Sequence, residues 1–235
     1  MNPYTSSTPP WISASTAESA FRTRAFMRSV YAWMAGGLVV TALAALWVVS
    51  SPFMQALVLG NPLVMFGLLI AEVGIVIVMS IKQRTMSAGT ASAAFLVYSF
   101  LTGLTLSVVF FRYTKSSVTL AFGVSAGMYG AMALYGLVTK RDLTSWGSFF
   151  RMGLFGVIIL MVAGFFIHAT ALQMTIATLG IFVFLGLTAY DNQKLKQLGA
   201  ANAGESVAVF GALILYLDFI NLFLFVLRLL GDRRR

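Results

Sequence analysis

Hydrophobic and polar positions alternate along this chain on the scale of whole helices. Apolar runs of about 20 residues, each long enough to cross the hydrocarbon core of a bilayer, are separated by short polar links. The pattern predicts seven transmembrane helices. Their residue ranges are 29–49, 62–81, 88–111, 117–139, 149–167, 172–190 and 207–230.

The composition supports a membrane protein and excludes several kinds of site. Hydrophobic residues make up 59% of the 235 positions and charged residues 10%, whereas a soluble domain has about 25% charged residues. The fold class is therefore an all-α membrane protein with little mass outside the bilayer. With no cysteine and a single His168, disulfides, thiolate nucleophiles and clustered zinc ligands are excluded, and no cofactor is expected.

Basic residues indicate how the chain is oriented. The net charge of +9 comes from Lys and Arg spread over short links, which is typical of membrane topology signals and not of nucleic-acid binding. They precede the first run and follow the second, fourth and sixth, so the N-terminus is predicted to be cytoplasmic. These residues are Arg22, Arg24, Arg28, Lys82, Arg84, Lys140, Arg141, Lys194 and Lys196.

Three regions follow from these patterns. Residues 1–28 are polar and rich in Ser, Thr and Pro, which predicts a flexible cytoplasmic tail. Residues 29–230 form the transmembrane domain, and residues 231–235 form a basic C-terminal tail. Seven crossings place Arg233, Arg234 and Arg235 outside, against the positive-inside rule. Either the last run re-enters and leaves on the cytoplasmic side or earlier helices fix the topology, and we favour seven crossings.

Two aspartates stand out against this apolar background. Asp218 lies inside the last run and Asp191 at the end of the sixth, although an acid within a membrane costs about 2.5–3.5 kcal/mol. If the last two helices are neighbours, the two carboxyl groups can share a proton and titrate as one unit. Carboxylate oxygens also suit calcium. We therefore predict a proton-sensitive cation site with Asp191 and Asp218 as calcium ligands.

Other readings of these polar residues remain open. Asp191 can equally lie hydrated at a helix end, while Asp218 accepts hydrogen bonds from Tyr or Asn neighbours. Asp218, Asn221 and Arg228 share one helical face, which predicts a polar stripe pointing into the bundle. Glu72 is a third intramembrane acid, either a protonated packing residue or a wall of the same cavity.

The basic pair Lys82 and Arg84 also has two readings. Both residues follow the second run, where they can anchor the helix at the lipid headgroups. In the alternative, one of them reaches the aspartates and forms an ionic latch.

Several of these stretches resemble the Bax inhibitor-1 (transmembrane Bax inhibitor motif) family, and its bacterial branch in particular. The resemblance covers nearly the whole chain after residue 20. It rests on residues 215–223 (LYLDFINLF) and 188–194 (TAYDNQK), with support from 31–34 (YAWM), 101–107 (LTGLTLS) and 139–143 (TKRDL).

The resemblance implies seven helices, with the C-terminal helix central and surrounded by the other six. It also implies a pH-sensitive calcium leak controlled by Asp191 and Asp218 in a bacterial inner membrane. In calcium-leaking relatives a basic residue at the end of the second helix latches one acid. This chain has Gln83 at that position, so any latch is displaced to Lys82 or Arg84.

Three functions are compatible with these features. The first is a non-enzymatic, pH-sensitive calcium or cation leak, whose partners are the lipid bilayer, calcium ions and protons. The second is a membrane interaction protein that modulates a quality-control protease or the stress and cell-death machinery without transporting ions. The third, an intramembrane aspartyl protease, is disfavoured because Asn192 and not a glycine follows Asp191.

Overall fold

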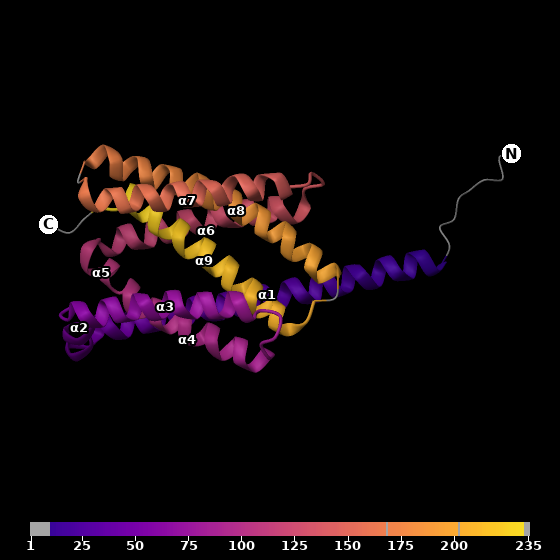
Figure 1. The fold of residues 1–235 in the computed structure, drawn as a ribbon, viewed down its shortest axis with the longest axis horizontal. Helices are drawn as coiled ribbons and strands as arrows, with labels where there is room; N and C mark the ends of the chain where they lie inside the picture. Colours follow the sequence, from indigo (N-terminus) through magenta and orange to yellow (C-terminus); the bar gives the residue numbers. More distant parts are fainter. Residues whose placement is uncertain (1–9, 168, 202, 233–235) are drawn as a thin grey trace.

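The computed structural model describes residues 10–167, 169–201 and 203–232, and in these ranges every regular element is a helix. Seven helical segments are long and apolar enough to cross a membrane, which confirms the predicted class of fold. Figure 1 labels the elements. They are α1 (Pro10–Ser50), α2 (Pro52–Val58), α3 (Pro62–Lys82), α4 (Ala88–Leu106), α5 (Val108–Arg112), α6 (Lys115–Val138), α7 (Thr144–Phe166), α8 (Thr170–Ala200) and α9 (Glu205–Leu230).

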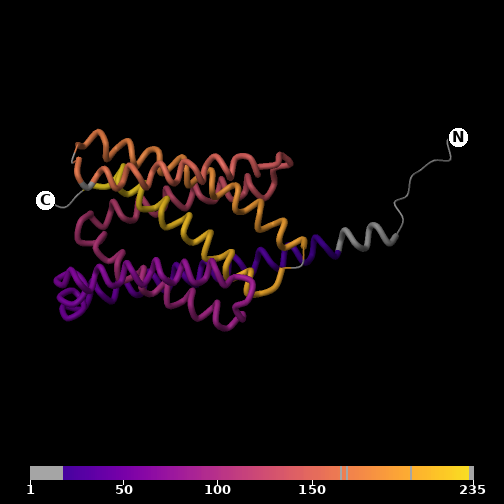
Figure 2. The backbone as a smooth tube through the Cα atoms, in the orientation of Figure 1, coloured from indigo at the N-terminus to yellow at the C-terminus, as the bar shows by residue number. Residues whose placement is uncertain are grey.

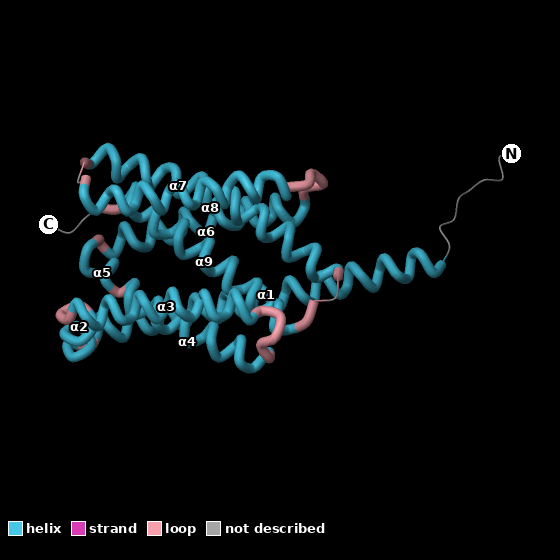
Figure 3. Tube along the Cα trace, in the orientation of Figure 1, coloured by secondary structure: helices cyan, strands magenta, loops and turns pink. Residues whose placement is uncertain are grey.

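Short connections join the spans (Figure 3), and side chains cap the first turns of some of the helices. The link after α1 is largely the extra helix α2, which the hydrophobic pattern does not predict. The Ser51 hydroxyl accepts a hydrogen bond from the Met54 N–H at 3.4 Å, and Pro52 occupies the first turn. Asn61 caps α3 in the same way by accepting from the Leu63 N–H at 3.0 Å. Both caps satisfy N–H groups that a helix start leaves without partners.

The first helix begins earlier than the sequence pattern predicts. Residues 10–28, assigned above to a flexible tail, continue α1, and residues 1–9 lie outside the described residues. Glu18 and Arg22 form an ion pair of 3.3 Å one turn apart, and Phe26 is buried against Gly199 of α8. Packing against α8 therefore extends this helix beyond its apolar run.

The C-terminal helix α9 is the most buried of the spans. In its most apolar stretch 72% of residues are buried, against 6% for α3. It packs mainly against α1, α4, α6 and α8, and in Figure 1 it crosses between the group of α1, α3 and α4 and the group of α6, α7 and α8. A helix that is apolar on all sides is expected to be buried. That all six other spans surround α9 stays a prediction.

The last helix is continuous, and the two ends of the described chain lie at opposite ends of the bundle (Figure 2). Its final turn leads to Asp232, whose N–H donates to the Ser117 hydroxyl at 3.0 Å. The Asp232 carbonyl accepts from the Thr114 N–H at 3.2 Å. The last run is therefore one unbroken helix, long and apolar enough to cross the membrane. Arg233, Arg234 and Arg235 lie outside the described residues.

Glycines allow two close helix contacts. A side chain at Gly136 of α6 would collide with the backbone of Ala189 of α8, and one at Gly103 of α4 would collide with the backbone of Thr41 of α1. Helices in lipid associate by close packing because lipid tails are as apolar as their side chains. The two glycines therefore allow α6 to pack closely against α8, and α4 against α1.

Substitution of Gly136 should test this packing. Gly136→Ala forces α6 away from the α8 backbone and should lower the free energy of unfolding by about 1–3 kcal/mol, measured as a lower melting temperature in detergent. Gly130→Ala on the same helix meets open space and serves as the control. Equal melting temperatures for the two variants would contradict the contact.

Candidate functional site

The antiparallel seam between α8 and α9 sets the register of the site. Gly180 of α8 packs against the ring of Phe225 of α9, and the rings of Phe184 and Phe225 lie 5.8 Å apart. Asp191 follows Phe184 by seven positions, and Asp218 precedes Phe225 by seven. Seven residues are close to two helical turns, so both acids stay on the faces that form the seam.

The two aspartates meet at this seam. Asp218 is 4% exposed, Asp191 is half-buried, and their carboxyl groups lie within range of a shared hydrogen bond. No described residue donates a hydrogen bond to Oδ2 of Asp218. If one of the two carboxyl groups is protonated, its O–H can donate a hydrogen bond to the other.

Neutral polar side chains from three helices surround the pair. The Tyr31 hydroxyl of α1 donates to Oδ1 of Asn192, and Nδ2 of Asn192 donates to the Thr188 carbonyl at 2.7 Å. Tyr129 of α6 interacts with both aspartates and donates to Sδ of Met34 at 3.5 Å. Sequence reasoning missed Tyr31, Tyr129 and Asn192. Tyr31 and Tyr129 lie in apolar runs, where a tyrosine is a weak signal of a polar site, and Asn192 lies in the polar stretch that follows the sixth run.

Two basic residues, Arg151 on α7 and Lys194 on α8, interact electrostatically with Asp191. Their positive charges both act on the Asp191 carboxyl group. The Arg151 guanidinium lies 5.4 Å from the centre of the Tyr190 ring, and its Nη1 donates to the Tyr190 hydroxyl at 3.3 Å. The Lys194 ammonium lies 5.9 Å from the same ring centre. Tyr190 thus positions two positive charges beside Asp191.

The predicted latch residues are not at the pair. Lys82 and Arg84 are exposed at the end of α3, and neither forms an ion pair with a described residue. Their latch role stays a prediction that the observed contacts do not favour.

Glu72 belongs to a second polar group, separate from the aspartates. Its Oε1 accepts a hydrogen bond from the Thr105 hydroxyl at 2.8 Å, and its charge acts on Tyr98 and Tyr216. The Tyr216 hydroxyl in turn lies 2.6 Å from the Thr41 hydroxyl. This group links α3, α4, α9 and α1. No direct interaction joins Glu72 to either aspartate within the described residues.

The remaining residues of the predicted polar stripe do not reach the pair. The Asn221 side chain donates to the Leu217 carbonyl of its own helix at 2.8 Å. Arg228 is half-buried in the last turn of α9, ten residues beyond Asp218. The three polar residues share one face of α9, but Phe225 lies between Asn221 and Arg228 on this face and packs against Phe184.

A loop next to the site is fixed by Gln193. Its Oε1 accepts from the Leu143 N–H at 2.9 Å, and its Nε2 donates to the Arg141 carbonyl at 2.7 Å. Within this loop the Thr144 hydroxyl and N–H both donate to Asp142, and these bonds lower the pKa of Asp142 below its ordinary value. The loop begins α7, the helix that carries Arg151.

The aspartate pair is a poor permanent metal site. No group of three or more His, Cys, Asp or Glu side chains able to hold a metal occurs within the described ranges. Calcium takes about 6–8 oxygen ligands, and two carboxyl groups offer at most four. That Asp191 and Asp218 bind calcium stays a prediction.

The fold and the site together define a multi-pass helical membrane protein with a buried acid pair between its last two spans. The family described as "Inhibitor of apoptosis-promoting Bax1" matches residues 23–235. The chain belongs to this Bax inhibitor family, which is not a known enzyme family.

Several bacterial proteins are similar over nearly their whole length. "Inner membrane protein YbhL" of Escherichia coli is 43% identical over 215 residues, which cover 89% of this chain and 92% of the relative. An uncharacterized protein of Rickettsia prowazekii is 40% identical over 217 residues (90% and 91%). One of Deinococcus radiodurans is 39% identical over 214 residues (89% and 91%).

The Tyr31 contact can be tested by deleting one hydroxyl group. Tyr31→Phe leaves Oδ1 of buried Asn192 without its donor, so we expect a loss of about 0.5–2 kcal/mol in unfolding free energy. Thermal unfolding in detergent measures the change. Tyr135→Phe is the matched control because Tyr135 is 45% exposed and its hydroxyl bonds to no described residue. A larger loss in the control would contradict the assignment.

Proposed function

We propose that the protein is a passive, proton-regulated leak for calcium or other cations, without enzymatic activity. The observation that carries this proposal is the buried Asp218 carboxyl group facing Asp191, with one oxygen that no described residue satisfies. An acid kept at such a cost within a membrane span favours a role in ion or proton passage. The inner membrane location of the Escherichia coli relative supports the same location here.

The regulation follows from the chemistry of two adjacent carboxyl groups. With one shared proton the pair carries a single negative charge, and the hydrogen bond holds α8 and α9 together. Loss of that proton leaves two negative charges that repel each other in a medium of low dielectric constant. The repulsion is relieved when the helices separate or when a cation enters between the carboxylates. Calcium, a hard ion that prefers oxygen ligands, is the expected substrate.

Arg151 and Lys194 set the pH at which this change occurs. Both lie beside Asp191 and stabilise its ionised form, and neither is at Asp218. They act on the pair through their charges, without an ion pair to either aspartate among the described residues, and in this proposal they replace Lys82 and Arg84 as the basic residues that regulate it. The surrounding basic links favour a cytoplasmic position for this end of the bundle, so the pair would respond to the cytoplasmic pH.

Calcium flux from liposomes should test the role of the pair. Purified full-length protein, reconstituted with a calcium dye, should pass calcium at a rate that changes roughly fivefold or more across the titration of the pair. Asp218→Asn with Asp191→Asn removes the shared proton and both charges, so the pH dependence should disappear.

The matched control is Glu205→Gln, which removes an exposed acid at the start of α9. It should keep the wild-type pH profile. Unchanged flux in the double variant would reject this pathway. A wild-type protein that passes no ions, together with a stable co-purifying partner, would favour a membrane interaction protein acting on a protease or other membrane assembly.

The role of Arg151 makes a separate prediction. Arg151→Gln removes a positive charge that stabilises the Asp191 carboxylate, so the pH midpoint of calcium flux should move to higher pH by up to about 1 unit. Flux measured over a pH series gives the midpoint. Lys82→Gln, at an exposed position away from the pair, should leave it in place. A shifted midpoint in Lys82→Gln and an unchanged midpoint in Arg151→Gln would instead support a latch at the end of α3.

A further inference from the structure

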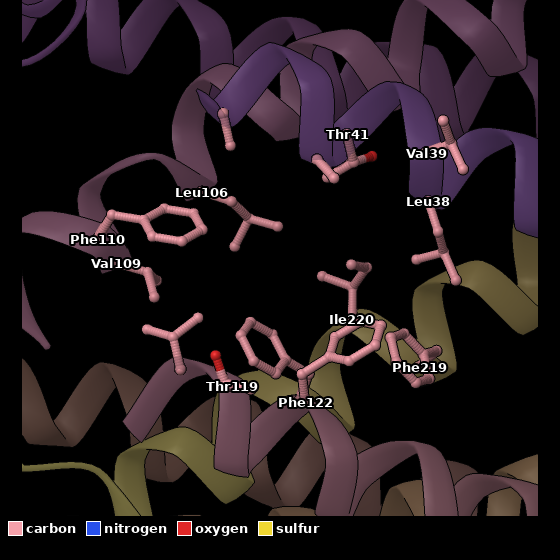
Figure 4. A pocket seen from close by; sticks show the side chains of 14 residues that line it. Leu38, Val39, Thr41, Leu106, Val109, Phe110, Thr119, Phe122, Phe219 and Ile220 are labelled. Atoms are coloured by element: carbon pink, nitrogen blue, oxygen red, sulfur yellow. The ribbon is translucent and has the colours of Figure 1, made fainter. Parts of the chain in front are cut away.

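A lateral cavity of 420 Å³ lies between α1 and α6, and its lining on α9 begins at Phe219, the residue after Asp218, and continues through Ile220 to Phe223 (Figure 4). This volume falls within the range of about 300–1,000 Å³ that is typical of ligand pockets. The cavity is almost wholly apolar. Its lining includes Leu38, Val39, Leu106, Phe122, Phe219 and Ile220.

The cavity opens where two helices diverge. Tyr129 of α6 contacts Met34 of α1 at 3.5 Å, and the cavity separates the two helices over the following turns. At the opening Val39 is 58% exposed and Phe122 is 50% exposed. Since α1 and α6 both span the bilayer, this opening faces lipid hydrocarbon. The occupant must therefore be apolar along the part that enters.

Two hydroxyl groups line the cavity, and they differ in availability. The Thr41 hydroxyl donates within the bundle and contacts the Tyr216 hydroxyl, so it is already used. The Thr119 hydroxyl is exposed and bonds to no described residue, and Figure 4 shows its oxygen directed towards the cavity. Thr119 can therefore donate to an ester oxygen of a ligand.

Positive charge lies just beyond the cavity at the membrane surface. Lys115 precedes Thr119 by one helical turn, and Arg112 follows Val109, another lining residue, by about one turn. Both basic residues are exposed at the ends of their helices. The nearby acid is Asp232, which is exposed and held at this end through its backbone. An apolar cavity with two basic residues at its end complements a phospholipid, whose acyl chain is apolar and whose headgroup contains a phosphate.

We propose that this cavity binds one acyl chain of an anionic phospholipid. The chain lies between α1 and α6 on the floor formed by α9. The Thr119 hydroxyl donates to an ester oxygen of the glycerol backbone, and Lys115 and Arg112 bind the anionic headgroup. Basic residues close to a membrane surface attract the headgroups of anionic lipids.

The floor of the cavity connects it to the aspartate region. The Phe219 ring lies edge-on to Phe122 at 5.4 Å and to Tyr129 at 5.6 Å, and Phe219 directly follows Asp218. A bound chain would hold Phe219, and with it this turn of α9. That regulatory consequence rests on the proposed leak, whereas lipid binding itself does not.

Native mass spectrometry of the full-length protein in mild detergent tests the proposal. Phosphatidylglycerol and phosphatidylcholine with identical acyl chains are titrated separately. Wild-type protein should bind phosphatidylglycerol on the order of tenfold more tightly. Arg112→Gln with Lys115→Gln should abolish this preference, and Ala42→Phe, at an exposed lining position, should reduce the binding of both lipids.

Matched controls separate the cavity from general effects. Lys82→Gln with Arg84→Gln removes the same charge at the opposite end of the bundle, and Ala131→Phe adds the same ring at an exposed position of α6 outside the cavity. Both should keep wild-type binding. If Ala42→Phe does not fold, Val39→Trp narrows the opening instead. Equal wild-type affinity for the two lipids, or full binding by a folded cavity variant, would overturn the proposal. No flux measurement enters this test.

Discussion

The contact between Asp191 and Asp218 is the interaction around which this bundle is arranged. A carboxyl group in the middle of a span is costly in lipid, so α9 must bury Asp218 against protein. Most of its other residues are apolar, and α1, α4, α6 and α8 pack against them. The acid then meets its partner across the α8 seam, where a shared proton, as proposed above, would reduce the cost of bringing two carboxyl groups together.

Close backbone packing keeps this seam in register. Gly180 of α8 leaves room for the Phe225 ring of α9, and Gly211 of α9 leaves room for the Leu195 side chain of α8. These two contacts hold the helices in the register that brings Asp191 and Asp218 together. Gly136 brings α6 against the α8 backbone at Ala189, two residues before Asp191. Because lipid gives little hydrophobic drive for helix association, these steric fits replace it as the source of specificity.

The two ends of the bundle differ in chemistry. Polar and charged side chains gather where α1 begins and α8 ends, with Arg151 and Lys194 beside the pair. The other end holds an apolar cavity between α1 and α6. Phe219 lies between these regions, in contact with Tyr129 on one side and Phe122 on the other. A change in the charge of the pair and a change in the lipid environment would thus act on the same turn of α9.

The sequence by itself determined the number and approximate ends of the spans, because length and hydrophobicity alone decide whether a helix can cross a bilayer. It also marked Asp191 and Asp218, since acids are rare in such runs. Tertiary structure decided which groups meet: it placed Glu72 with Thr105, left Lys82 exposed, and brought Arg151 to Asp191. These choices depend on helix rotation and neighbour order, which nearly uniform apolar runs do not encode in their hydrophobic pattern.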